Sequence, residues 1–379
     1  MAPVYLDNNA TTPCDPRVVE AMLPYFLHQF GNAASADHAY GWQAREAVDD
    51  ARSQVADLIG ASPRQIIFTS GATEAINLAL KGLAEQATAG HIITCKTEHK
   101  AVLDTCAYLE TKGFAVTRLD TDTSGALSPA VLEAAIRPDT VCIALMYANN
   151  ETGVVHPVKA FAQIARQHDI PFFCDATQAV GKIPVDVEAD GIDLLAFSAH
   201  KMFGPKGAGV LYVRSKRLGL LPQLHGGQHE GGLRSGTLNT PAIIGLGKAA
   251  EIAKQEMATD ASRLQALRDQ LEQTILQQLP GSKVNGGGER LAHVTNLLLP
   301  YPDVEQLLLS LSSQLAVSRG SACAGLVQKP SHVLQAMGLS KTAAAQSVRI
   351  SLGRFSQQDE VEEAVQHLVN AVRSAVPAM

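Results

Sequence analysis

The sequence predicts an α/β fold. In it, a mostly parallel sheet covered by helices forms a large domain, and a smaller α+β domain follows. Short apolar runs of strand length alternate with helical patterns through most of the chain, which is typical of a parallel sheet covered on both faces. The chain has 379 residues, of which 46% are hydrophobic, enough for a large core and a second domain.

The elements of the large domain follow a short strand and a turn cluster at residues 8–13. Asp15 and Pro16 open the first helix, 17–30, by cap and first-turn chemistry. Further helices are expected at 40–59, 75–83, 103–112, 129–136 and 158–168. The strands are expected at 66–69, 91–94, 115–119, 140–146, 171–174, 194–197 and 209–213.

The C-terminal part begins with two amphipathic patterns, near 240–256 and 261–278, followed by Leu279-Pro280-Gly281. We interpret this passage as the entry into the small domain, with a strand near 293–299, a helix at 303–311 and a strand near 348–351. The predicted division assigns 15–258 to the large domain, and 1–14 with 259–379 to the small domain.

Composition and charge exclude several classes of protein. The net charge is −6 and no Lys/Arg-rich run occurs, so we expect no direct nucleic-acid binding. No apolar run is long enough for a membrane span, and the N-terminus lacks the features of a signal peptide. The six cysteines are scattered without a Cys-x-x-Cys pair, which argues against a metal site and fits a reducing cytoplasm.

Lys201 follows the strand at 194–197, in Ser198-Ala199-His200-Lys201. Open α/β sheets place their ligands at the carboxyl ends of strands. A lysine there, beside a hydroxyl, an imidazole and glycines, suits a Schiff-base lysine. Residues 70–74, Ser-Gly-Ala-Thr-Glu, join another strand to a helix. Such a turn favours an anion at the helix start, and it is a phosphate site only if a phosphorylated molecule binds nearby.

Other polar residues also follow predicted strands. His99 comes after 91–94, Asn150 after 140–146, and Asp175 with Gln178 after 171–174. A buried polar group without a partner costs about 1–3 kcal/mol, so this set at one sheet edge is expensive for stability alone. Pyridoxal phosphate (PLP) explains the set. A lysine forms the Schiff base, an acidic residue pairs with the pyridine nitrogen, and an imidazole stacks on the ring.

The chain resembles the NifS/IscS-type (group I) cysteine desulfurases, class V aminotransferase-like PLP enzymes of fold type I. The matching motifs run through the whole length, at residues 5–12, 70–74, 97–99, 149–151, 175–178, 198–201, 234–237, 321–323 and 349–353. By this resemblance Lys201 is the Schiff-base lysine, Asp175 pairs with the ring nitrogen and Gln178 bonds the phenolic oxygen. His99 stacks on the ring and is able to take a proton. The remaining cofactor ligands implied, mostly for the phosphate, are Ala72, Thr73, Asn150, Ser198, His200 and, from the partner subunit, Thr237.

The resemblance also implies a reaction. Asn150 and Arg349 bind the carboxylate of L-cysteine, and Cys323 is the nucleophile that carries the sulfur as a persulfide. A homodimer is expected to release L-alanine and to pass the sulfur to an acceptor protein, such as an iron–sulfur scaffold.

Other hypotheses stay open. One is a neighbouring PLP enzyme, such as a selenocysteine lyase, a cysteine-sulfinate desulfinase or an aminotransferase, although an ordinary aminotransferase needs no thiol at Cys323. Another is a non-enzymatic sulfur carrier, against which Lys201 argues. The sequence does not identify the acceptor, since iron–sulfur assembly, tRNA thiolation, cofactor sulfuration and DNA phosphorothioation all draw on such enzymes.

Overall fold

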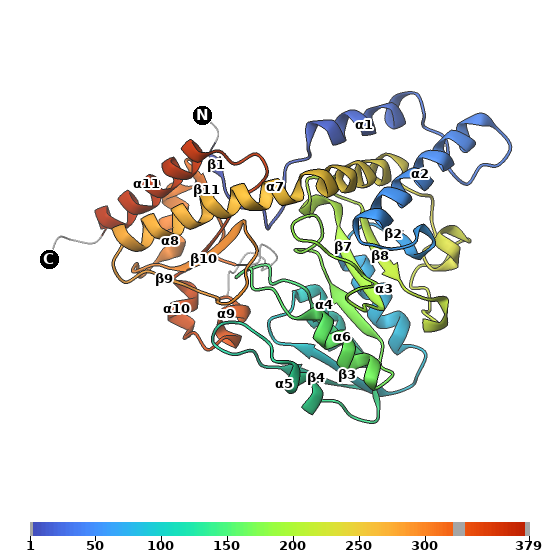
Figure 1. Ribbon diagram of the computed structural model, residues 1–379, viewed down its shortest axis with the longest axis horizontal. Helices are drawn as coiled ribbons and strands as arrows, with labels where there is room; N and C mark the ends of the chain where they lie inside the picture. The colour runs from blue at the N-terminus through green and yellow to red at the C-terminus, as the bar shows by residue number, and fades with distance from the viewer. Residues whose placement is uncertain (1–2, 321–329, 376–379) are drawn as a thin grey trace.

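The computed structural model describes residues 3–320 and 330–375, and a seven-stranded sheet organises it (Figure 1). The strand order is β2-β8-β7-β6-β5-β3-β4. β8 is antiparallel to both of its neighbours, and the other pairs are parallel, which confirms the mostly parallel sheet. The bounds are β2 (Ile66–Thr69), β3 (Gly90–Cys95), β4 (Phe114–Leu119), β5 (Thr140–Met146), β6 (Phe172–Asp175), β7 (Leu194–Ser198) and β8 (Gly209–Val213).

Helices cover both faces of this sheet, and the strand sequences show why. Successive strand residues point to opposite faces, so Ile92 packs in one core and Ile93 in the other. One core is completed by α3 (Ala72–Ala84) and α4 (Lys100–Glu110). The opposite core takes residues of α2 (Ala39–Leu58), α6 (Val158–Gln167) and the start of α7 (Thr240–Gln278). Two further helices are α1 (Pro16–Leu27) and α5 (Pro129–Ala134).

A separate core lies at the other end of the molecule (Figure 1). It contains a three-stranded antiparallel sheet, β12-β10-β9, and a parallel pair, β1-β11. We propose that 1–14 and 259–379 form this smaller domain and 15–258 the larger one. The strands are β1 (Val4–Tyr5), β9 (Lys283–Val284), β10 (Val294–Leu298), β11 (Leu315–Ala316) and β12 (Ser347–Ser351), and the helices α8 (Val304–Leu311), α9 (His332–Ala336), α10 (Lys341–Ala345) and α11 (Gln358–Ala375).

The two amphipathic patterns at 240–256 and 261–278 belong to one helix of 39 residues, α7. Residues 257–260, Met-Ala-Thr-Asp, include neither glycine nor proline, so nothing in them stops a helix. The helix is about 58 Å long at 1.5 Å per residue, and it packs Leu246 in the large core and Leu271 in the small one. Within the described ranges no helix, α7 included, combines the length and the apolar character that a membrane span needs.

Candidate active site

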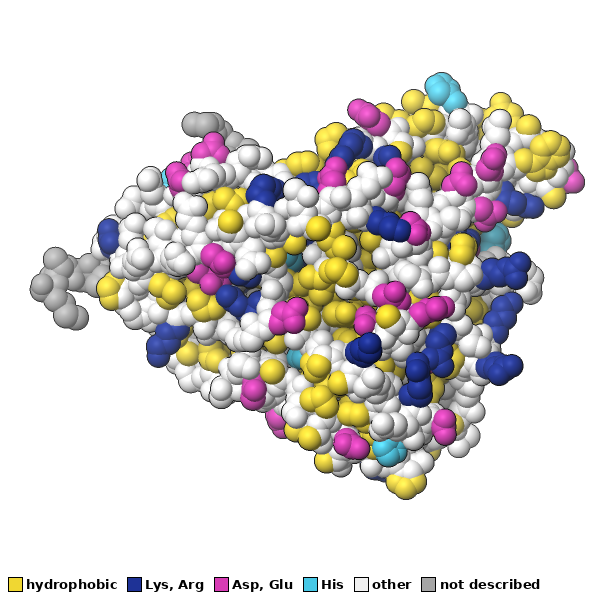
Figure 2. Space-filling view, in the orientation of Figure 1, with side chains coloured by type: hydrophobic (Ala, Val, Ile, Leu, Met, Phe, Trp, Pro, Cys, Tyr) yellow, Lys and Arg dark blue, Asp and Glu magenta, His cyan; other side chains and the backbone are white. Residues whose placement is uncertain are grey.

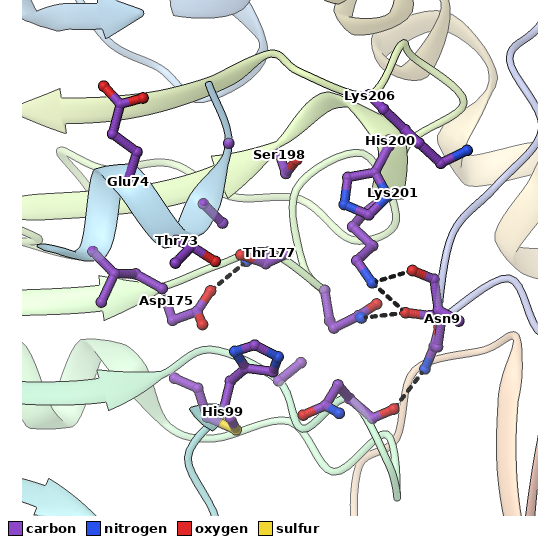
Figure 3. Close-up of a pocket in the computed structure, with 18 of the residues that line it drawn as sticks. Asn9, Thr73, Glu74, His99, Asp175, Thr177, Ser198, His200, Lys201 and Lys206 are labelled. Carbon is purple, nitrogen blue, oxygen red and sulfur yellow. Dashed lines mark hydrogen bonds between the residues drawn. The ribbon is translucent and has the colours of Figure 1, made fainter. Parts of the chain in front are cut away.

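A cavity of about 390 Å³ lies at the carboxyl ends of β6 and β7, beside the first turn of α3 (Figure 3). Small-molecule sites have volumes of roughly 300–1,000 Å³. The cavity brings together most of the residues that the sequence singles out: Ala72, Thr73, His99, Asn150, Asp175, Gln178, Ser198, His200, Lys201 and Arg349. Sequence reasoning missed other residues of its lining, among them Asn9, Thr177 and Lys206.

Two predicted residues are not placed in this cavity. Cys323 lies outside the described residues. Thr237 is exposed and does not line the cavity of its own chain. Its neighbour Arg234 donates from Nε to Glu74 Oε1 at 2.8 Å, so the start of the 234–237 motif is fixed to α3 of the same chain. Although burial opposes it, the hydrogen bonds from Arg234 and Ser70 lower the pKa of Glu74.

Lys201 ends a single helical turn, Ala199–Lys201, that follows β7 directly. Its Nζ donates to the backbone carbonyl oxygens of Asn9 at 2.5 Å and Ala10 at 2.7 Å, and Figure 3 shows the amine pointing toward Asn9 across the cavity. Asn9 Nδ2 in turn donates to Asn150 O at 3.0 Å, and His293 Nε2 lies 2.8 Å from Asn9 Oδ1. The amine is therefore held by the N-terminal segment, which both cores contact.

Asp175 ends β6, is buried, and accepts a hydrogen bond from Thr177 N at 3.0 Å (Figure 3). A second buried carboxyl, Glu98, lies nearby and accepts from Met146 N at 2.6 Å. Burial first, and then the charge of Asp175, raises the pKa of Glu98 well above its ordinary value. Of these two carboxyls only Asp175 lines the cavity, so Asp175 is the one that offers a carboxyl group to a ligand there.

His99 caps α4, and the cap determines its tautomer. Its Nδ1 accepts from Ala101 N at 3.1 Å, so the neutral ring carries its proton on Nε2. Burial lowers the pKa of His99, with Lys201 and His332 adding to the effect and Asp175 opposing it. The ring is thus a proton donor at Nε2, and a second proton can bind only at Nδ1, at the expense of the cap. For His99 to take a proton, as expected from the sequence, Nδ1 must therefore give up its hydrogen bond from Ala101 N.

The opposite end of the cavity suits an anion. Gly71 precedes α3, and a Cβ on Gly209 would collide with the Gly71 backbone, so glycine at 209 lets the turn before α3 lie against β8. The free N–H groups of the first turn of a helix attract negative charge. Burial, with Lys201 and Lys206 nearby, lowers the pKa of His200 to about 4, so His200 is a neutral hydrogen-bonding group at physiological pH.

Arg349 on β12 brings a cation from the smaller core. It is 1% exposed, donates from Nη2 to Asp7 Oδ1 at 2.8 Å, and donates from Nη1 to Asn150 O at 3.1 Å. Its Nε and the Thr177 Oγ1 are buried, and neither has a hydrogen-bond partner among the described residues. Buried polar atoms are rarely left unpaired. Both residues line the cavity. A polar ligand with anionic groups therefore fits it, and both PLP and an amino acid carry such groups.

Residues 4–364 match the family described as aminotransferase class-V. The chain belongs to this family. It is 52% identical over 375 residues to cysteine desulfurase IscS of Anaeromyxobacter dehalogenans, covering 98% of this chain and 93% of the relative. A solved NifS-like protein superposes with a TM-score of 0.92 at 36% identity, covering 99% and 100% of the two chains. A structure described as SspA in complex with cysteine superposes with a TM-score of 0.82 at 39% sequence identity. The match covers 93% of this chain and 99% of that one. The resemblance inferred from the motifs is confirmed, and enzymes of this family depend on PLP.

We predict that Asp7→Ala destabilises the fold, because it leaves the buried guanidinium of Arg349 without its carboxylate partner. The expected loss is about 3 kcal/mol in the free energy of unfolding, the low end for a buried pair, because the Asp7 side chain is 18% exposed. Urea denaturation measures it. Asp57→Ala is the control, since Asp57 pairs with Lys254 at the exposed surface. Its loss should stay below about 1 kcal/mol. Equal, small losses for both variants would show that the Arg349 pair is not needed.

Proposed function

We propose that the protein is a PLP-dependent cysteine desulfurase, which converts L-cysteine to L-alanine and passes the sulfur through Cys323 to an acceptor protein. The observation that carries the proposal is one cavity lined by Lys201, Asp175 and Arg349, in a chain 52% identical to a cysteine desulfurase. A similar protein has been solved with cysteine, which supports this substrate.

The cofactor residues act as anchors. Lys201 would hold PLP through its amine, Asp175 would pair with the ring nitrogen, and His99 would stack on the ring. The phosphate would be held by the first turn of α3 and by the hydroxyl and imidazole groups of Thr73, Ser198 and His200, which line the cavity (Figure 3). When bound, PLP withdraws electrons from the α-carbon of an amino acid.

The substrate residues orient L-cysteine. Arg349 offers its unpaired Nε to the carboxylate, beside Asn150, whose own backbone oxygen holds Nη1 of the same arginine. Lys201 is the base for the α-proton, because its amine lies within the cavity against two carbonyl oxygens that stabilise it once protonated. His99 presents Nε2–H to the cavity as a hydrogen-bond donor.

Cys323 is the nucleophile of the proposed reaction. Its thiolate attacks the sulfur of L-cysteine, so that an S–S bond forms and the C–S bond breaks. The electron pair of the broken bond stays on the carbon, which takes a proton and gives L-alanine, and the enzyme keeps a persulfide. The cysteines that the structure describes are poorer nucleophiles than an ordinary thiol, because a raised pKa leaves less thiolate. Burial raises the pKa of Cys95 to about 11 and of Cys106 to about 12, and it also raises the pKa values of Cys14, Cys142 and Cys174.

We further propose a homodimer, in the cytoplasm, with an iron–sulfur scaffold as the acceptor. Thr237 is exposed and away from its own cavity, which suits a residue that completes the site of a partner subunit. Hydrophobic side chains gather over the α1–α2 end of the molecule (Figure 2). The large exposed ones in this region are Val19, Leu23, Phe26, Leu27, Phe30, Tyr40 and Trp42. Apolar patches of this kind mark interfaces. The acceptor is proposed because the relatives at 50–52% identity are named IscS.

The central experiment is Cys323→Ser. We expect the variant to stay yellow with PLP and to change its absorption when L-cysteine is added, yet to make less than about 1% of the wild-type L-alanine, because serine cannot accept the sulfur. Alkylation and mass spectrometry of the wild type should find the extra sulfur on the peptide that contains Cys323. Cys14→Ser is the control and should retain turnover. Normal alanine production by Cys323→Ser would refute the mechanism.

Lys201→Ala distinguishes the proposed PLP enzyme from a non-enzymatic sulfur carrier. The wild-type protein should absorb visible light and keep its PLP through dialysis, whereas the variant should lose the cofactor and all measurable turnover with its circular dichroism unchanged. Lys254→Ala, at an exposed ion pair, should behave like wild type. A colourless wild-type protein that added PLP does not restore would favour the carrier.

The dimer is tested by complementation between two defective chains. Thr237→Val should weaken PLP retention, and a mixture with Lys201→Ala should recover part of the activity, because each mixed dimer has one site with an intact Lys201 and a partner Thr237. Sedimentation should give twice the mass of the chain. Active protein that sediments as a monomer, or no recovery from proven mixed dimers, would contradict the shared site.

A further inference from the structure

Lys182 contacts the cofactor cavity only through another side chain. Its Nζ donates to Gln178 Oε1 at 2.5 Å, and it lies among the residues of a separate small cavity of about 30 Å³, with Asn8, His293 and Arg354. Gln178 itself lines the cofactor cavity, whereas Lys182 does not. Gln178 therefore lies between the cofactor cavity and Lys182.

The two hydrogen bonds of Gln178 fix which way its amide faces. The amide oxygen and nitrogen of a glutamine look alike in a structure, and only their partners tell them apart. Here Lys182 Nζ donates to one end, and the other end, Nε2, lies 3.1 Å from the backbone carbonyl of Asn9, which can only accept. Gln178 thus holds its oxygen toward Lys182, and its nitrogen keeps a second N–H for an acceptor in the cavity.

We propose that Lys182 is a positioning residue that holds the amide of Gln178 so that its N–H donates to an anionic oxygen on the PLP ring. The proposal rests on the proposed use of PLP at this site. Burial, with Lys201 and Arg349 nearby, lowers the pKa of Lys182 well below the ordinary lysine value. The orientation is the same in both protonation states, because the Asn9 carbonyl can only accept and so keeps Nε2 on its side, while the Lys182 amine has N–H donors for Oε1 in either state.

Lys182→Met removes the donor and keeps most of the length of the unbranched side chain. The amide of Gln178 then keeps only its hydrogen bond to the Asn9 carbonyl, so its orientation toward the ligand is held less firmly, and we expect the dissociation constant of PLP to rise about tenfold, with a shift of the visible absorption maximum. In Gln178→Leu, which has no amide to orient, adding Lys182→Met should change the dissociation constant less than about twofold, since residues that act as a unit are not additive.

The experiment titrates PLP into the four apo proteins of this cycle, followed by absorption and by quenching of protein fluorescence, with Lys254→Met as an exposed lysine control. Lys182→Thr, whose short side chain cannot reach Gln178, serves if the Met variant does not fold, and the same loss is expected. Additive losses, or an unchanged dissociation constant in Lys182→Met, would overturn the positioning role. Failure of the wild-type protein to bind PLP would overturn the proposed function itself, and this inference with it.

Discussion

The backbone carbonyl of Asn9 is the acceptor on which the site depends. It receives a hydrogen bond from Lys201 and another from Gln178, and the side chain of the same residue joins Asn150 and His293. A carbonyl oxygen has two lone pairs and no proton to give, so it fixes both groups as donors. Because the segment that carries Asn9 leaves β1 of the smaller core, the reactive amine is positioned from outside its own sheet.

Charge in the cavity is confined by burial. Desolvation favours the neutral forms of His99 and His200 in the cavity and of Glu98 beside it. The cavity is also lined by Asp175 and Lys201 from the large core and by Arg349 from the small core. Arg349 is neutralised on one side by Asp7. The arrangement favours a ligand with an anionic end toward Arg349. It also leaves little buried charge without a partner, and such unpaired charge would be costly.

The sequence predicted the parts of this structure that local patterns encode. β5 and β8 have the expected bounds, and Lys201, Asp175 and His99 were identified because each follows a strand at one edge of the sheet. Asn9, Thr177 and Lys206 were missed as lining residues. Asn9 and Lys201 are 192 positions apart in the sequence although they are hydrogen-bonded, and no local sequence pattern predicts such a contact. The two amphipathic patterns near 240–256 and 261–278 form the single helix α7, which packs Leu246 in the large core and Leu271 in the small one.

The pairing of the N-terminal segment with the C-terminal strand has a consequence for the order of events on the ribosome. Asn9 N donates to Ser351 Oγ across 342 positions of sequence, and β1 pairs with β11. At about 5–20 residues per second, the first segment waits on the order of tens of seconds for its partners to emerge. The nascent chain can complete the large sheet well before then, but it still lacks Arg349. Capture of the cofactor in its final geometry is therefore tied to the end of translation.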